Sequence, residues 1–421
     1  MRILLVTITS PWPPTNGQRI RNCSIIRALC EDGHEVSLIS FQEQSGESPK
    51  SPKTWCGDIV WVPRPRGYSG NNYLGRLWAL LAGLPFGVVR FRSREMTAAV
   101  TRRLSAGNID ALICDDVYVI ANVADCHGIP LLLNKASIVF EEAARYAAHS
   151  QNVAVRAYVF VESRLLRRWE VRSCNRANLL LTCSDRDRRV LQRLEVNTNS
   201  FVVPNALDLR DYEAYSGDDG RTVMFTGAMD WYPNQDAVSF FVAAIWPALQ
   251  RLVPHTEFLV VGRNPPSSLR RSLATQGRIR FTGTVPDIRP VLKQAAVCVV
   301  PLRIGSGTRI KILEAAAMGK AIVSTSVGAE GLEFENGREI IIADRPQEFA
   351  EAVAHLLENR KLRDQMGQAA RRRVCNSHGI EAVRAGLRSA FEAIAPTNVS
   401  AVKQSQTRSQ NNRVPKIQPN R

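Results

Sequence analysis

The chain has 421 residues, a formal net charge of +16 and a pI near 9.8. Its length exceeds what one ordinary hydrophobic core organises and indicates two or three domains. Hydrophobic residues at 45% and charged residues at 22% are typical of a soluble globular protein. The basic excess points to an anionic partner. Three kinds fit: a nucleic acid, an anionic membrane surface or a phosphorylated substrate.

The cysteine pattern favours a reducing compartment. The nine cysteines form no C-x-x-C pair and no metal-ligand spacing with the six histidines, so no metal site is expected. No secretory signal is expected at the start, because Met1 and Arg2 lead into a short strand. We therefore expect a cytoplasmic protein.

The first 200 residues alternate apolar runs with helical patterns. Strands are predicted for residues 2–9, 35–41, 58–63, 111–115, 130–136 and 179–184. Helices are predicted from Gln18 to Glu31 and, rich in arginine, over 153–178. Alternation of this kind implies parallel strands joined by crossover helices, which is a doubly wound α/β sheet.

The longest apolar run is LWALLAGLPFGVV, residues 77–89. Thirteen residues are too few to cross a hydrocarbon core, which needs about 20. Arginines flank the run at 76, 90, 92 and 94, which suits a surface segment lying on anionic lipid. A core helix with a solvated basic rim fits the same pattern, and the sequence leaves both interpretations open.

A second series of strands and helices follows the linker at 202–222. Strands are predicted for residues 222–228, 257–263, 278–285, 296–302, 321–327 and 339–344, with helices over 236–252, 287–294, 308–318 and 346–359. The prediction is therefore two tandem Rossmann-like domains that enclose a cleft. Their bounds are 1–203 and 204–375, followed by a helix over 376–395 that returns to the first domain and a disordered basic tail over 396–421.

Residues 301–332, PLRIGSGTRIKILEAAAMGKAIVSTSVGAEGL, place a glycine loop between an apolar strand and a helix. A helix beginning near Gly307 would direct the free N–H groups of residues 305–309 at one point, where the helix dipole adds positive charge. This arrangement holds phosphate groups in α/β proteins. Glu314 shares a helix face with Lys311. It would either accept hydrogen bonds from a ribose or form a surface ion pair of little energetic value.

Several motifs, in this order along the chain, resemble family 4 of the retaining glycosyltransferases, which have the GT-B fold of two facing Rossmann-like domains. The motifs are SPWPPTNGQRIRN, VVPNALD, FTGAMDWYPNQDAV, FTGTVPDIRPVLKQAAVCVVPL and GSGTRIKILEAAAMGKAIVSTSVGAEGL. The resemblance covers about residues 1–395 and is most specific in the second half. Within this family, the chain resembles sugar transferases of bacterial polysaccharide biosynthesis.

The resemblance implies a nucleotide-sugar site formed by both domains. Glu314 would bind the ribose, the loop from Gly305 to Thr308 would meet the diphosphate and donor sugar, and the backbone at 284–285 would meet the base. Gly17 would lie under the diphosphate and Gly227 would line the cleft. The full binding set that it implies is Gly17, Arg19, Gly227, Arg263, Thr284, Val285, Gly305, Ser306, Gly307, Thr308, Arg309, Lys311 and Glu314.

The sequence departs from the family pattern in three places. The glutamate that often stands eight positions before the ribose-binding one is Ser306 here. AMDWYPN lacks the arginine and lysine often found there, so the cations would come from Lys311, Arg309, Arg263 or Arg19. The histidine often found after the fourth strand is replaced by Asp115 or Asp116. The candidate catalytic residues are therefore Asp115, Asp116, Lys311 and Ser306.

The implied reaction is hexosyl-type transfer from a UDP- or GDP-sugar to an acceptor hydroxyl with retention of the anomeric configuration, without metal or cofactor. The expected acceptor is a saccharide or a lipid-linked sugar, and the basic helices suggest peripheral contact with the anionic inner face of the cytoplasmic membrane. No nucleic-acid partner is expected, since the arginines are scattered and no basic motif interleaved with aromatics appears. The alternative is a catalytically silent nucleotide-sugar-binding protein.

Overall fold

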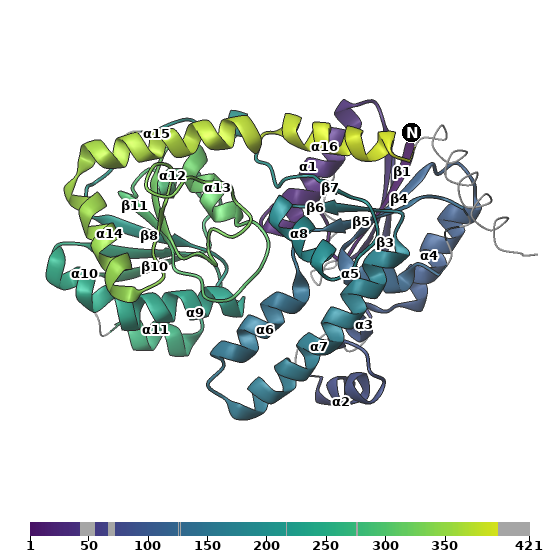
Figure 1. Cartoon of the computed structure of the whole chain (residues 1–421), viewed down its shortest axis with the longest axis horizontal. Coiled ribbons are helices and arrows are strands. Elements are labelled where there is room, and N and C mark those ends of the chain that lie inside the picture. Colours follow the sequence, from purple (N-terminus) through teal and green to yellow (C-terminus); the bar gives the residue numbers. More distant parts are fainter. Residues whose placement is uncertain are drawn as a thin grey trace, which may run out of the picture.

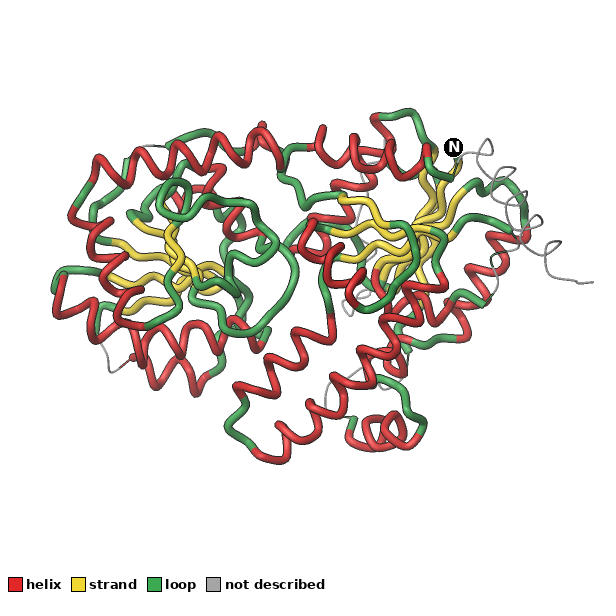
Figure 2. The backbone as a smooth tube through the Cα atoms, in the orientation of Figure 1, coloured by secondary structure: helices red, strands yellow, loops and turns green. Residues whose placement is uncertain are grey.

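The computed structural model describes residues 1–42, 55–65, 72–124, 126, 128–215, 217–274 and 277–394. They form two α/β domains that lie side by side (Figures 1 and 2). The predicted tail over 396–421 lies outside the described residues.

The first domain is built on a 7-stranded sheet with the order β3-β2-β1-β4-β5-β6-β7, in which every pair is parallel. Its strands are β1 (Arg2–Thr7), β2 (Glu35–Phe41), β3 (Asp58–Val62), β4 (Ala111–Asp115), β5 (Leu131–Lys135), β6 (Leu179–Thr182) and β7 (Ser200–Val202). Its helices are α1 (Gly17–Glu31), α2 (Tyr73–Leu81), α3 (Phe86–Phe91), α4 (Arg94–Ser105), α5 (Asp116–Val119), α6 (Val139–His149), α7 (Val153–Arg176) and α8 (Asp185–Arg193).

The second domain is built on a 6-stranded sheet with the order β10-β9-β8-β11-β12-β13, again all parallel. Its strands are β8 (Thr222–Thr226), β9 (Glu257–Val261), β10 (Ile279–Gly283), β11 (Val297–Val300), β12 (Ala321–Ser324) and β13 (Ile341–Ile342). Its helices are α9 (Tyr232–Phe240), a π-turn (Phe241–Ile245), α10 (Trp246–Leu252), α11 (Ser267–Ala274), α12 (Arg289–Leu292), α13 (Ile310–Ala317), α14 (Pro346–Glu358) and α15 (Arg360–Ser377).

These sheets confirm the predicted doubly wound α/β class, with some differences in detail. Strand β7 was not predicted, because three half-buried residues give no apolar run. The helix predicted over 236–252 begins at Tyr232 and is interrupted by the π-turn. The helix predicted from Thr308 begins only at Ile310, because the two glycines keep the preceding backbone extended or left-handed.

The last described helix, α16 (Ile380–Glu392), returns to the first domain. Its buried side chains join the core of that domain, where Leu387 and Phe391 share a cluster with Leu5 of β1. Two of its arginines, Arg384 and Arg388, form ion pairs with Asp32 at the end of α1, at N···O distances of 2.6 and 2.5 Å. The chain therefore crosses between the domains twice.

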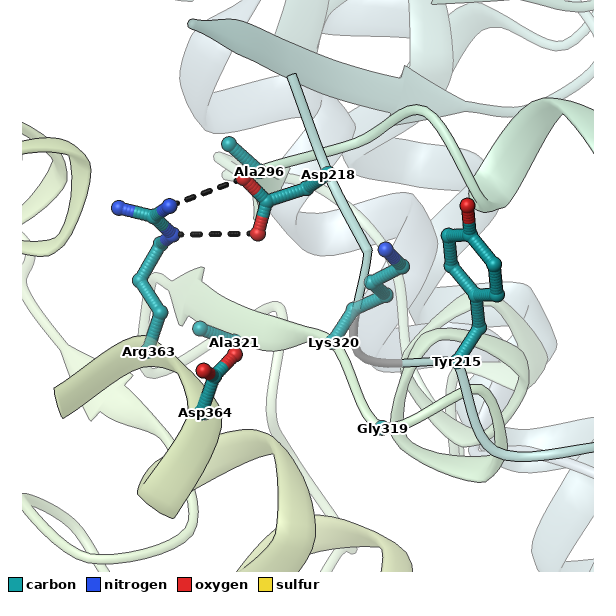
Figure 3. Close-up of a pocket in the computed structure, with 8 residues that line it drawn as sticks. All are labelled: Tyr215, Asp218, Ala296, Gly319, Lys320, Ala321, Arg363 and Asp364. Carbon is teal, nitrogen blue, oxygen red and sulfur yellow. Dashed lines mark hydrogen bonds and ion pairs between the residues drawn. The ribbon is translucent and has the colours of Figure 1, made fainter. Parts of the chain in front are cut away.

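The linker between the domains is fastened to the second domain just before β8. Figure 3 shows Arg363 of α15 directed at Asp218, with N···O distances of 2.9 and 3.4 Å. Beside it, the Lys320 ammonium donates to the backbone oxygens of Gly217 and Lys293 and lies 5.1 Å from the Tyr215 ring centre. These contacts fix the linker where it enters the second sheet.

The apolar run 77–89 is divided between α2 and α3, which are separated by a turn that ends in Pro85. Helix α3 buries Phe86 and Val88, as the core interpretation requires. Helix α2 buries only Ala79 and exposes most of its large apolar side chains, as the surface interpretation requires. None of the helices in the described part of the chain is both long and apolar enough to cross a membrane.

Candidate functional site

The glycine loop, residues 305–309, lies between β11 and α13 and is pressed against the first domain. Gly305 and Gly307 have φ values of 133° and 77°, which side chains rarely adopt. A Cβ at Gly307 would lie 2.4 Å from the backbone oxygen of Ala136, in the loop after β5. Glycine is therefore required at 307 both by the backbone conformation and by the close approach of the two domains.

Arg309 holds the glycine loop in shape from the inside. Its side chain is buried, and its guanidinium donates to the backbone oxygens of Ser306, Gly307 (2.5 Å) and Val327 (3.3 Å). Burial lowers the pKa of Arg309, and the nearby Glu142 carboxylate opposes that shift. Its hydrogen-bonding capacity is largely used by the loop itself, so Arg309 is poorly placed to act as a free cation.

Two helix N-termini face each other across the domain junction. Helix α1 begins at Gly17, and a Cβ there would lie 3.4 Å from a side-chain carbon of Ile310, the first residue of α13. The first turn of α1 is capped by Asn16, whose side chain accepts from Arg19 N–H at 3.0 Å. The Arg19 guanidinium donates to the Pro13 oxygen at 3.3 Å and so ties α1 to the loop that precedes it. The positive ends of two helix dipoles thus meet at one place.

Lys311 supplies a cation beside this meeting point. Its ammonium donates to the side-chain oxygen of Asn234 at 2.8 Å and lies 4.0 Å from the ring centre of Phe225 on β8. A Cβ at Gly227 would lie 2.8 Å from the same nitrogen, so glycine leaves room for the ammonium. Burial, with Arg309 adding to it, lowers the pKa of Lys311 to about 7. Among the described residues it forms no ion pair with a carboxylate.

Glu314 lies one helical turn beyond Lys311 and is half-buried. One of its oxygens accepts from the Tyr212 hydroxyl at 3.3 Å, and burial raises the pKa of Glu314 to about 7. Lys311 opposes that shift, although no direct contact joins the two side chains. The alternative of a surface ion pair is therefore wrong. Both ionisable groups are partly desolvated and face the same region, which is common at functional sites.

We expect Glu314 to reduce stability at high pH. Because its pKa in the folded chain is raised, folding favours the protonated form. That contribution is complete below the ordinary pKa of about 4.5 and is lost as the pH rises through about 7. E314Q mimics the protonated form. At pH 8 it should melt about 2 °C or more above the wild type, and the difference should vanish at about pH 3.5, where the carboxyl group is protonated in both the folded and the unfolded chain. Thermal unfolding at both pH values checks this. A variant less stable than the wild type at pH 8 would contradict it.

The loop after β10 approaches Glu314 from another side. Thr284 is exposed and Val285 is half-buried against the core. Asp287, two residues further on, lies near enough to raise the pKa of Glu314. Arg263, by contrast, pairs with Asp230 at 3.1 Å near the surface, and both side chains are about 40% exposed (39% and 43%). That ion pair makes Arg263 the weakest of the predicted cations.

The two predicted catalytic aspartates are buried in the first domain. Asp115 accepts hydrogen bonds from Gln18 (2.9 Å), Asn22 (2.7 Å) and Asn134 (3.2 Å), and burial raises its pKa to about 7. Asp116 has a φ of 73° and lies 3.2 Å from the ammonium of Lys135, which is itself fully buried. Their catalytic role stays a prediction, which these contacts do not favour.

A row of buried polar side chains joins the first domain to the glycine loop. The Arg21 guanidinium donates to Asn134 at 2.9 Å and to Asn205 at 3.0 Å. Asn205 in turn donates to the Thr308 hydroxyl at 2.6 Å. The Ser306 hydroxyl donates across the junction to the backbone oxygen of Ile138 at 2.7 Å. The serine that replaces the expected glutamate therefore fastens the two domains together.

An ion network lies beside the loop and spans the same junction. Arg145 of α6 binds both oxygens of Glu330 at 2.6 and 2.7 Å and also donates to the Gly305 oxygen. Arg186 of α8 lies 2.8 Å from Glu330 and 2.6 Å from Glu141. The rings of Tyr146 and Tyr232 add a contact with centres 4.3 Å apart. We call Arg145, Arg186, Glu141 and Glu330 the interdomain ion network.

Replacing Glu330 should loosen the junction. E330Q leaves two arginines without their shared carboxylate, in a place where that side chain is only 14% exposed. We expect the free energy of unfolding to fall by about 1–3 kcal/mol. E335Q is the matched control, because Glu335 pairs with Arg338 at the solvent-exposed surface. Denaturant unfolding measures both. An effect no larger than that of E335Q would contradict the proposed importance of the network.

Sequence reasoning missed several of these residues. Asn205 and Asn234 stand inside motifs that carry the resemblance, VVPNALD and FTGAMDWYPNQDAV, so a signal existed for them. Glu330 also stands inside such a motif, GSGTRIKILEAAAMGKAIVSTSVGAEGL. Nothing local marks Arg145 or Arg186, because their contacts with Glu330 join segments more than 140 residues apart.

The sequence of the second domain matches a known family model. Residues 220–359 match the model described as glycosyl transferases group 1. This supports a glycosyltransferase, and it covers β8 to α14, including the glycine loop, Lys311 and Glu314. A curated protein of Klebsiella pneumoniae, described as an uncharacterized 44.6 kDa protein in cps region, is 20% identical over 377 residues, which is 85% of this chain and 91% of that protein.

Solved structures share the architecture over nearly the whole chain. Sucrose-phosphate synthase from Thermosynechococcus elongatus has a TM-score of 0.70 at 18% identity, covering 94% of this chain and 99% of that one. HepE of Anabaena in complex with UDP-glucose has a TM-score of 0.65 at 14% identity, covering 93% and 100%. The chain therefore has the GT-B fold.

Proposed function

We propose that the protein is a retaining glycosyltransferase that moves a sugar from a UDP- or GDP-sugar to an acceptor hydroxyl, in polysaccharide or glycolipid biosynthesis. One observation carries the proposal. The Lys311 ammonium lies beside two helix N-termini and donates to the uncharged side chain of Asn234 and not to a carboxylate, and the partly desolvated Glu314 carboxylate lies one helical turn away. An uncompensated cation and two helix dipoles suit a diphosphate. A carboxylate on the next turn suits the ribose hydroxyls.

In this proposal the donor lies across the domain junction. The backbone N–H groups of the glycine loop and the Lys311 ammonium hold the diphosphate, with Gly17 beneath it. Glu314 accepts from the ribose, and Thr284 with Val285 contacts the base. Support for this arrangement comes from the match of residues 220–359 and from HepE, which binds UDP-glucose. The acceptor, a saccharide or a lipid-linked sugar, would bind to the first domain.

The proposed chemistry is transfer by attack on the same face as the leaving group. The bond from the anomeric carbon to the diphosphate oxygen breaks, the acceptor oxygen bonds to that carbon, and the acceptor proton passes to the diphosphate. Lys311 and the loop N–H groups stabilise the charge that develops on the diphosphate, and no metal is required. Closure of the two domains over the donor would exclude water, and the interdomain ion network, which spans the junction, would help to hold the domains together.

The test is a thermal-shift panel of nucleotide sugars followed by turnover. We expect one UDP- or GDP-sugar to raise the melting temperature, and its nucleoside diphosphate to be released when acceptor is supplied. Stabilisation by none of the sugars would contradict the proposal.

A catalytically silent nucleotide-sugar-binding protein is the second candidate. It is favoured by the contacts of Asp115 and Ser306, which engage both groups in structural hydrogen bonds. The two candidates differ in one result. A thermal shift without release of nucleoside diphosphate, in the presence of acceptor extract, would identify the silent binder.

A further inference from the structure

Helix α2 exposes its large apolar side chains, unlike a helix that buries them in a soluble core. Its apolar side chains at positions 73, 74, 77, 78 and 81 follow helical spacing and form one stripe. That stripe is exposed: Tyr73, Leu74 and Leu81 are 79%, 81% and 80% exposed, and Leu77 and Trp78 are 55% and 54% exposed. We call these five residues the α2 stripe. Such a stripe is unfavourable in water unless something covers it.

The single charged residue of α2, Arg76, faces the protein. The Arg76 guanidinium lies 5.1 Å from the ring centre of Phe86 on α3 and 5.3 Å from that of Tyr158 on α7. Glu162 of α7 accepts from the N–H of Phe86 at 2.7 Å, which fixes the turn after α2. Helix α2 lies near α3 and α7 (Figure 1), and these contacts leave its large apolar side chains exposed.

Arginines are frequent in the segment that carries the α2 stripe and in the neighbouring helix α7. The segment from Tyr73 to Arg94 contains four arginines and no acidic residue, and Arg92 and Arg94 are exposed. The neighbouring helix α7 adds exposed arginines and three further exposed apolar side chains, Val153, Phe160 and Val161, at 80%, 52% and 45%. The exposed arginines of α7 are Arg156, Arg164, Arg167, Arg168, Arg172 and Arg176.

We propose that the α2 stripe inserts into the interfacial layer of an anionic bilayer, with the surrounding arginines on the lipid phosphates. Tryptophan and tyrosine at the edges of a leucine face, with arginines around it, are suited to the headgroup boundary. A second copy of the chain is a poor occupant, because two arginine-rimmed faces would repel each other. The proposal goes beyond glycosyl transfer, since it concerns where the protein resides and does not depend on the donor site.

Flotation of the purified full chain with vesicles tests this. Vesicles of phosphatidylcholine alone are compared with vesicles that also contain phosphatidylglycerol. We expect the wild type to float with the anionic vesicles and much less with the neutral ones. L74E/L77E/L81E should lower the partition coefficient at least about tenfold. L252E is the matched control, because Leu252 is exposed in the second domain (44%), and it should float like the wild type.

The charge contribution is measured separately. R92Q/R94Q should lower partitioning onto anionic vesicles by about fivefold for each arginine and leave partitioning onto neutral vesicles unchanged. Circular dichroism and the melting temperature report whether each variant is folded. If the wild type fails to float with anionic vesicles, or if the triple variant floats as well as the wild type, the proposal is overturned. A wild-type dimer in sedimentation that L74E/L77E/L81E converts to a monomer would also overturn it, in favour of self-association.

Discussion

Replacing Lys311 with methionine is expected to lower kcat by about 10²–10³-fold. The ammonium lies between Asn234, Phe225 and Gly227 without an opposing carboxylate, so it is available to the leaving diphosphate. Charge on that group grows as the glycosidic bond breaks, and a fixed cation in a desolvated site stabilises the transition state more than the bound donor. Methionine keeps the length of the side chain and removes the charge. Steady-state kinetics with the preferred donor measures the effect.

The matched control is K361M, on the exposed surface of α15, which should leave kcat unchanged. The pH profile gives an independent check. Lys311, with a pKa lowered to about 7, is protonated below that value, and Glu314, with a pKa raised to about 7, is ionised above it. Because the free enzyme needs both charges, kcat/KM for the donor should be highest near pH 7. If K311M retained near-normal kcat, Lys311 would not be the cation at the diphosphate.

Replacing Glu314 with alanine is expected to weaken donor binding by about 10²-fold. The loss comprises two hydrogen bonds from ribose hydroxyls to a partly desolvated carboxylate. Because the ribose is remote from the reacting bond, its contacts are made equally in the ground state and the transition state. KM should therefore rise with little change in kcat. Titration calorimetry with the nucleoside diphosphate measures binding, and E358A, exposed at the end of α14, is the control. Unchanged affinity in E314A would contradict the ribose assignment.

The fold class could be predicted from the sequence because the core strands are apolar runs. Segments such as 111–115 and 296–302 are buried over most of their length in parallel sheets, and such strands read as continuous hydrophobic stretches. Short or half-buried elements gave weaker signals, so β7 was missed and the start of α13 was placed too early. The glycines that mark the loop at 305 and 307 are also what delays the helix.

The candidate site was predictable only in part. Spacing alone places Lys311 and Glu314 on one face of a helix, and the family resemblance supplied the rest of the set. Spacing could not reveal that the Arg309 guanidinium turns back into its own loop, or that Ser306 bonds to Ile138. Both facts depend on the approach of the two domains. The same is true of the contact between Arg145 and Glu330, which are 185 positions apart.

The most direct measurement is a comparison of wild type and E314Q with a nucleoside diphosphate and its 2′-deoxy and 3′-deoxy forms, by titration calorimetry. If residues 305–309 and Lys311 bind the diphosphate while Glu314 binds the ribose, loss of a hydroxyl should weaken binding to the wild type by about tenfold and leave binding to E314Q nearly unchanged. Equal losses in both proteins, or no loss in either, would show that the Glu314 carboxylate does not bind the ribose.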